Sequence, residues 1–536
     1  MAEFLVAQLH GLILVALSLS VGGVAFVLAV LKPVTQTSPL AALALRRSIL
    51  LMISGAFGLA LAQATALSVT LWSLADEFGH WPFQEFWTTI FARAGAVRAV
   101  LALCLAAVGM TLLQHPKSDW RWIIAVICAA LLLMSGAWQV HAASRLQDVS
   151  WLILGTLIHQ FCAALWAGGI LHLLAFWRLA RRHPLDPGLW PRLLQRFSPI
   201  AGVGVAVLVS AGLYLVWRFV GSWANLVSTA YGIMVLAKLA MLGAALTLAR
   251  LNLQYVQHWA VGSNHRSVYT LVPPFVEAES VLLIVALFTA VTLTSAPPAI
   301  DVSGERPSLA EVGEFLRPTW PQFVPPPRAE LMADYRSPLD FYSPPPGELD
   351  RLQSRFNHNV AGLLVFIVGF LAVLDRAFKL RWARHWPLSF FALGFFLLVF
   401  GQPSSWPLGD EGFWETLASP SVVQHRLATL LVFIMGFFEW RVQVGGLGNT
   451  RWRYVFPILG MLGGAVLFTH THPQFETKSL FFIELSHVLV GFLAVLVGVG
   501  RWLELRLPAP ANRGPGILWT MCLVATGLVL LLYRED

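Results

Sequence analysis

The chain has 536 residues, of which 57% are hydrophobic and only 12% are charged, whereas soluble domains carry about 25% charged residues. Apolar runs of about 20 residues recur from end to end, and each is long enough to cross the hydrocarbon core of a bilayer as a helix. These runs are continuous, unlike the short alternating segments of a membrane β-barrel. Composition therefore predicts an all-α, polytopic helical membrane protein and excludes a soluble one.

The net charge of +8 does not indicate nucleic-acid binding, because Lys and Arg lie in short loops between apolar runs. The four cysteines fall inside apolar runs and form neither a disulfide framework nor a CxxC motif. The first residues, MAEFLVAQLHG, lack a basic region and a cleavage site, so we expect a retained first helix. No P-loop, dinucleotide fingerprint or catalytic triad indicates an enzyme or an ATP-driven pump.

About fourteen spans are predicted in two groups. Eight precede a long polar segment, at 4–31, 48–73, 92–113, 120–142, 151–177, 197–220, 229–251 and 272–296. Six follow it, at 356–375, 386–402, 421–438, 454–470, 480–500 and 515–533. The segment between the groups is rich in Pro and mixed charge, which is typical of a linker or lid. Three domains are predicted: an eight-helix membrane domain (1–298), a Pro-rich linker (299–354) and a six-helix, His-rich membrane domain (355–536).

The loops between these spans alternate in charge. Loops 178–196, 375–385 and 501–513 are strongly basic, whereas loops 74–86 and 403–420 carry acidic groups. Basic loops stay in the cytoplasm, so this alternation predicts that both termini and the Pro-rich linker lie outside.

Five histidines of the last six spans share one depth, near the outer surface. They are His358, His425, His470, His472 and His487. Glu484 lies three residues before the last of them and therefore on the same helix face. Imidazole is the commonest transition-metal ligand, and ionisable groups inside a membrane are usually functional. We therefore expect a metal or haem site here; structural hydrogen bonding is the alternative for each single histidine.

Three further histidines lie in the outer part of the first group of spans: His10, His141 and His159. They are candidates for a second metal station, and the thiol of Cys162, on the same face as His159, would favour Cu(I). His172 is deeper and off that face.

Lys238 and the pair Glu277 and Glu279 lie in adjacent spans at middle to inner depth. A buried ion pair that fixes helix packing is the favoured interpretation, and a proton or ion relay is the alternative.

Five stretches of the first 298 residues carry a family resemblance as an ordered set. They are SGAWQVHAAS around His141, HQFCAALWAGGILHLL from His159, RFSPIAGVGVAVLVSAGLY from Arg196, TAYGIMVLAKLAMLGAALTLARLN from Thr229 and EAESVLLIVALFTAVTLTSAPPA from Glu277. In these stretches the chain resembles the copper-resistance D family of bacterial inner-membrane proteins. The second half is similar to the C-terminal extension of longer members, in FNHNVAGL, QHRLATLLVFIMGFFEWR, LFTHTHPQ and FIELSHVLVGFLAVLVGVGRWLELRL. The commoner family phrase SGHA is interrupted by AWQV before His141.

The resemblance implies copper handling at the periplasmic side of the bacterial inner membrane, described for the family as uptake. The leading hypothesis is a copper-binding and copper-translocating membrane protein that captures the ion at the five outer histidines of the second half. Glu484 would orient His487 or bind the ion directly, and a soluble periplasmic copper-binding protein is a candidate partner. The sequence shows no inner ligand cluster matching the outer one, which counts against transport and towards binding, sensing or delivery.

The alternative hypothesis is a b-type haem protein that carries electrons. His358 with His425, or His425 with His487, would then be axial ligands on facing helices. Haem needs two histidines opposed across a bundle, whereas copper accepts three or four gathered at one spot. Five histidines and a carboxylate therefore favour copper over haem b.

Overall fold

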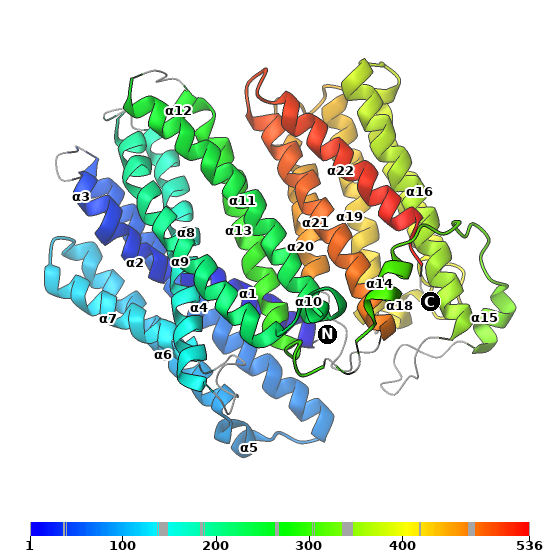
Figure 1. Ribbon diagram of the computed structural model, residues 1–536, viewed down its shortest axis with the longest axis horizontal. Helices are drawn as coiled ribbons and strands as arrows, with labels where there is room; N and C mark the ends of the chain where they lie inside the picture. Colours follow the sequence, from blue (N-terminus) through cyan, green and yellow to red (C-terminus); the bar gives the residue numbers. More distant parts are fainter. Residues whose placement is uncertain are drawn as a thin grey trace. The chain divides into compact units, whose positions relative to one another are not determined.

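A computed structural model describes most of the chain as helix (Figure 1). The description leaves out residues 1, 36–37, 39, 137, 139–147, 183–185, 187, 263–266, 303, 305, 335–346, 418–419, 470–477 and 535–536. The residues that it covers form no β-strand, and twelve of their helices are long and apolar enough to cross a membrane. The prediction of an all-α, polytopic membrane protein is confirmed.

Two other predicted spans are helices in the structure as well. They are α19 (Pro420–Gln443) and α20 (Val455–Thr469), of which α20 has only 15 described residues. With the twelve long apolar helices, they occupy the fourteen positions expected from the sequence.

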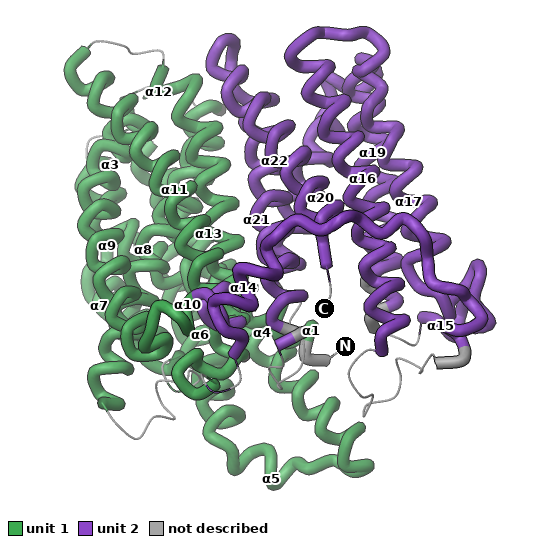
Figure 2. Tube along the Cα trace, turned by 45° about the vertical axis from the view of Figure 1, so that its right-hand side comes forward, with its two compact units in different colours: residues 1–226, 234–303 green, residues 227–233, 304–536 purple. Residues whose placement is uncertain are grey.

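The chain folds into two compact units (Figure 2). Unit 1 comprises residues 1–226 and 234–303, and unit 2 comprises residues 227–233 and 304–536. The described part of the Pro-rich segment from residue 304 onward thus belongs to unit 2.

The first span of unit 1 is one helical rod that contains two π-helical turns. Its parts are α1 (Ala2–Leu17), η1 (Ser18–Gly22), α2 (Gly23–Phe26), η2 (Val27–Leu31) and α3 (Lys32–Thr35). The other long helices are α4 (Ala41–Phe78), α6 (Ile90–Gln114), α7 (Asp119–Gly136), α8 (Val149–Arg182), α9 (Leu189–Val220), α11 (Ala230–Ala260) and α13 (Val272–Ser295). Three short helices join them: α5 (Phe83–Thr88), α10 (Trp223–Ser228) and α12 (Ser267–Thr270).

The first span crosses α8 with the two backbones in contact. A Cβ atom on Gly22 would lie 2.0 Å from the carbonyl oxygen of Ala164, and one on Gly168 would lie 2.0 Å from that of Ser18. Neither position has room for a side chain. Close crossings at small residues are how membrane helices gain packing energy, since lipid supplies no hydrophobic drive between them. Helices α4 and α13 also pack on this span.

Side chains from neighbouring helices bond to carbonyl groups in both π-helical turns. A π turn departs from the regular ladder of backbone hydrogen bonds. His172 Nε2 on α8 donates to the carbonyl oxygen of Leu19 at 3.0 Å, and Arg196 Nε on α9 donates to that of Ala29 at 2.7 Å. His172 is therefore tied to the backbone of the first span, which gives it a structural role.

In the described part of unit 2, six helices are long and several are short. The long helices are α16 (Glu348–Phe378), α17 (Ser389–Phe400), α19, α20, α21 (Lys478–Arg506) and α22 (Arg513–Leu531). The short ones are α14 (Leu309–Phe315), α15 (Arg328–Asp334), η5 (Ala383–Leu388), α18 (Phe413–Thr416) and η6 (Arg451–Tyr454).

Helices α16 and α22 also meet backbone to backbone. A Cβ atom on Gly362 would lie 2.1 Å from the amide nitrogen of Leu531, and one on Gly369 would lie 2.7 Å from that of Val524. These two glycines are two helical turns apart and share one face of α16. Their contact sets the register of the two helices and brings the C-terminal end of α22 beside the start of α16.

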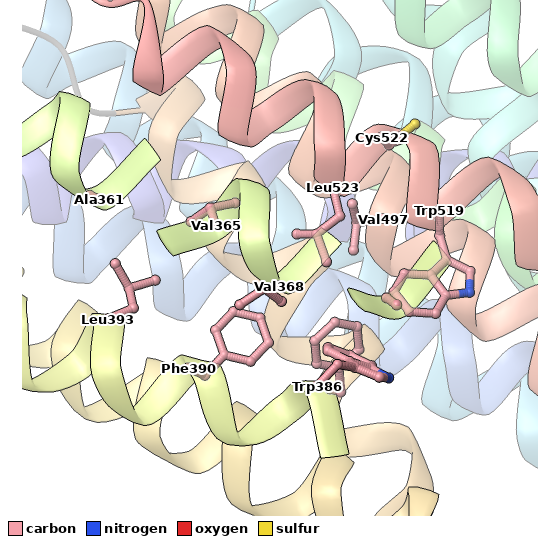
Figure 3. Close-up of a cluster of buried hydrophobic side chains, with 12 residues drawn as sticks. Ala361, Val365, Val368, Trp386, Phe390, Leu393, Val497, Trp519, Cys522 and Leu523 are labelled. Carbon is pink, nitrogen blue, oxygen red and sulfur yellow. The ribbon is translucent and has the colours of Figure 1, made fainter. Parts of the chain in front are cut away.

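Aromatic and aliphatic side chains fill the core of unit 2 (Figure 3). Trp386 and Trp519 are almost fully buried, and their ring centroids lie 5.6 Å apart. The cluster draws on α16, η5, α17, α20, α21 and α22 and includes Ala361, Val365, Val368, Phe390, Leu393, Phe456, Val497, Cys522 and Leu523. This core holds α16 and α21, the helices that carry two of the predicted histidines.

Candidate functional site

His358 on α16 and His487 on α21 are brought into contact. Their ring centroids lie 6.1 Å apart, and the ring planes stand at 77° to each other. An ion held in a nearly linear arrangement between two imidazole nitrogens, at about 2 Å from each, would separate the centroids by about 6 Å. The spacing of the two rings thus matches that of two ligands sharing one ion.

Both rings are anchored through the same nitrogen. His358 Nδ1 donates to the carbonyl oxygen of Ser354 at 2.8 Å, and His487 Nδ1 donates to that of Ile483 at 2.7 Å. A carbonyl oxygen can only accept, so these bonds assign the proton of each neutral ring to Nδ1 and the lone pair to Nε2. Metal-binding histidines commonly have this arrangement, in which the second nitrogen donates to a backbone carbonyl.

Tyr533 and Asn359 support the His358 ring. The Tyr533 ring stacks on it with centroids 4.1 Å apart. Asn359 is fully buried; its Nδ2 donates to the carbonyl oxygen of Tyr533 at 2.9 Å, and its Oδ1 accepts from the amide of Gln322 at 2.7 Å. Asn359 therefore joins the end of α22 and the Pro-rich segment to α16. Sequence reasoning assigned neither residue a role.

The described part of the Pro-rich segment packs on the start of α21. Phe315 stacks on Phe482 with ring centroids 4.5 Å apart, and Lys478 Nζ lies 2.8 Å from Glu311 Oε1. The hydrogen bond from Lys478, together with those from the Ser308 capping box, lowers the pKa of Glu311 to about 2. This segment was expected to be a linker or lid without chemistry, and here it covers one end of the helix that carries His487.

The other predicted metal ligands of unit 2 are less closely tied to His358 and His487. His425 on α19 is exposed; its Nδ1 accepts from Gln402 Nε2 at 2.8 Å, and it lies near enough to His358 to act on it electrostatically. Glu484 is half-buried on α21, three residues before His487. His470 and His472 lie outside the described residues. Within the described parts of the chain, no three His, Cys, Asp or Glu side chains gather as a metal-binding group.

In unit 1, no described contact joins His10 to His159. His159 Nδ1 donates to the carbonyl oxygen of Leu208 on α9 at 3.1 Å, whereas His10 lies within electrostatic range of Arg98 on α6. A permanently charged guanidinium opposes a cation at His10. The thiol of Cys162 is buried one turn beyond His159, and the third predicted ligand, His141, lies outside the described residues.

The sequence favoured an ion pair of Glu279 with Lys238, but the hydrogen-bond partners of Glu279 in the structure are other residues. Its Oε1 accepts from Trp166 Nε1 and its Oε2 accepts from Asn252 Nδ2, both at 2.9 Å. The side chain is 2% exposed. Lys238 instead acts electrostatically on His159.

A buried charge network, which the sequence analysis missed, lies at the end of α16 and α21 far from the two histidines. Arg501 contacts Glu439 at 2.7 Å and Glu504 at 2.5 Å, and Arg376 contacts Glu504 at 2.7 Å. Glu439 and Arg501 are 0% and 5% exposed. The available signal was the acidic residues in FFEWR and GRWLELR, just beyond the ends of the predicted spans 421–438 and 480–500. Only the basic residues of these stretches were used, to assign orientation.

The fold thus defines a polytopic α-helical membrane protein, and comparisons with known proteins narrow its class. Residues 191–293, which run from α9 to α13, match the family model described as copper resistance protein D. The resemblance to the copper-resistance D family is confirmed over that range. Copper transport protein CutJ of Bacillus subtilis (strain 168) is 28% identical to the chain over 248 residues.

That alignment covers 44% of this chain and 44% of the relative, so the chain matches less than half of the relative's length. No solved structure matches the chain. The chain is thus similar to a copper-resistance family model and to a copper transport protein, and neither likeness supports the alternative of haem b.

Proposed function

We propose that this membrane protein captures copper ions between His358 and His487 and thereby mediates copper uptake or periplasmic copper handling. The observation that carries the proposal is the contact of the two rings, with Nδ1 of each bonded to its own helix. Imidazole nitrogen suits copper. Because the hydrogen bonds and the stacked Tyr533 already hold the rings, little side-chain entropy is lost when an ion binds.

The remaining predicted residues complete the proposed capture site. His470 and His472 follow α20, and His425 and Glu484 lie on α19 and α21. A ring at His425 is already within electrostatic range of His358. Glu484 would hold His487 in place or bind the ion itself.

His10, His141 and His159 form the proposed second station, in unit 1, and the charge of Arg98 near His10 makes His10 the weakest of the three ligands. The hydrogen bond from His159 Nδ1 to Leu208 supports it, because this bond leaves the lone pair on Nε2, as in the proposed capture site. The buried thiol of Cys162 adds a ligand that prefers Cu(I).

The setting of this activity is also proposed. The likeness to the copper-resistance family supports a bacterial inner membrane as the location. Basic loops facing the cytoplasm would then put both termini and the histidine pair on the periplasmic side. A soluble periplasmic copper-binding protein would then deliver or receive the ion. The role is that of a transporter or metal-binding protein rather than an enzyme.

Copper counting on purified protein tests the capture site. The wild type in detergent is loaded with copper, desalted and analysed for metal, beside the double variant His358→Ala/His487→Ala. His385→Ala is a matched control. His385 lies on η5, away from the pair, and its ring accepts a hydrogen bond from Trp440 Nε1 at 3.0 Å. We expect the double variant to lose copper while the control keeps it, with equal folded yields on size exclusion.

Equal copper in all three proteins would refute the assignment of this pair. A Soret band in the visible spectrum of the wild type would restore the haem alternative. Uptake of copper into proteoliposomes separates the two proposed roles, because copper that binds without entering the lumen identifies a binding or delivery protein.

A further inference from the structure

A buried carboxyl group of unit 1 has no role in the proposed copper sites. Glu279 lies seven residues after the start of α13, about 10 Å along the helix axis. Its side chain is 2% exposed, and its two oxygens accept from Trp166 on α8 and Asn252 on α11. Three helices therefore meet at one carboxyl group inside the membrane-spanning part of the unit.

Among the residues that the structure describes, no Lys, Arg or His forms an ion pair with this group. The described groups on the surrounding helices include His172 on α8, Lys238 and Arg250 on α11 and Glu277 on α13. None of them forms an ion pair with Glu279, whose described polar contacts are the hydrogen bonds from the indole and the amide. An ionised carboxylate in such surroundings is costly, and a carboxyl group there takes up a proton instead.

A second observation supplies an acceptor for such a proton. Asn252 is 7% exposed, and its Oδ1 is buried without a hydrogen-bond partner. Amide oxygen and nitrogen have nearly the same shape, so a half-turn of the amide places Oδ1 opposite the carboxyl group. An O–H on Glu279 Oε2 would then donate to this oxygen. Trp166 Nε1 can only donate, which reserves Oε1 as an acceptor and leaves Oε2 for the proton.

We propose that Glu279 is a proton-binding site of unit 1, with Asn252 as the partner that reverses its hydrogen bond on titration. Protonation forms one O–H bond on Oε2 and turns the carboxylate into a carboxylic acid. In the neutral state the acid donates to Asn252 Oδ1, and in the ionised state Asn252 Nδ2 donates to Oε2. The bond between α11 and α13 is thus kept in both states. The proposal concerns a proton and stands independently of the copper sites.

Infrared spectroscopy of the purified full-length protein in detergent tests this proposal. A protonated carboxyl group has its own C=O stretching band, which shifts when H₂O is replaced by D₂O. We expect the difference spectrum between the wild type and Glu279→Gln at pH 7 to contain this band. The control variant is Glu311→Gln, because Glu311 is exposed and paired with Lys478 and should be ionised at this pH.

Thermal unfolding supplies a second measurement on the same variants. Glutamine has the shape of the neutral acid: its oxygen accepts from Trp166, and its amide donates to Asn252 Oδ1. Glu279→Gln should therefore melt at pH 7 no lower than the wild type. An absent band in the wild-type difference spectrum, or a clear loss of melting temperature in Glu279→Gln, would overturn the proposal, because each shows a carboxylate that is ionised and stabilised as such.

The variant Asn252→Leu tests the partner separately. Leucine fills nearly the same volume without hydrogen-bonding, so the band should remain and move to the higher frequency of a carboxylic acid that lacks this acceptor. An unchanged band frequency would remove Asn252 from the site. Copper does not enter any of these measurements, so their outcome is distinct from that of the copper proposal.

Discussion

Replacing Arg501 by Met should destabilise unit 2 strongly, because this arginine is shared by two buried carboxylates. It contacts Glu439 at 2.7 Å and Glu504 at 2.5 Å, and its side chain is 5% exposed. Breaking a buried ion pair by removing one partner costs about 3–5 kcal/mol, since the remaining charge is left uncompensated. Arg376 still contacts Glu504 at 2.7 Å, so the uncompensated group in the variant is the fully buried Glu439.

The matched variant Glu439→Leu should cost less, because Arg501 keeps its contact with Glu504. We expect about 1–3 kcal/mol, the cost of leaving a buried donor without its partner. The double variant should recover much of the loss of Arg501→Met. Unfolding in detergent by sodium dodecyl sulfate, followed by tryptophan fluorescence, measures the three free energies. A cost for Arg501→Met equal to or below that of Glu439→Leu would refute the idea that the arginine is the shared centre.

Three further variants test the framework around the sites. Gly362→Leu should destabilise the fold by at least about 1–3 kcal/mol through overpacking, because α22 leaves no room for a side chain. It should also lower copper retention, and retention at the wild-type level would contradict the link between this helix crossing and the site. His172→Leu should cost about 1–3 kcal/mol in the same detergent assay, because a partly buried carbonyl of a π turn loses its donor. Unchanged stability would show that the bond is dispensable. Tyr533→Ala should weaken copper binding up to about tenfold, which corresponds to the loss of one aromatic contact with His358. Competition with a chelator measures the affinity, and equal affinity would mean that the stacked ring does not position the ligand.

The candidate site was partly predictable because helix rise converts sequence position into depth. Counting residues from the span ends placed His358 and His487 at the same level of the membrane, and the structure brings their rings together. The same counting placed His10 and His159 at one level, but these side chains interact with α6 and α9 respectively. Depth is a property of one helix, whereas the direction in which a side chain points among its neighbours depends on how the helices pack.

The residues that sequence reasoning missed act across helices far apart in the chain. Asn359 and Tyr533 meet only because glycines let α16 and α22 approach backbone to backbone. Likewise, Glu439 reaches Arg501 from a separate helix. Glu279 was singled out from the sequence as a charge inside a span, yet its indole and amide partners come from two other helices.

The sequence by itself determined the class of this protein, its spans and the helices that carry histidine, because the cost of exposing polar backbone and charge to lipid is imposed one segment at a time. The resemblance to a copper-resistance family was likewise carried by linear motifs, and the family match confirms it for residues 191–293. The tertiary structure alone decided which histidines meet, which charges are compensated and which carboxyl group is left among neutral partners. Those outcomes depend on packing between segments up to hundreds of residues apart, where the presence or absence of one Cβ atom sets the register of two helices.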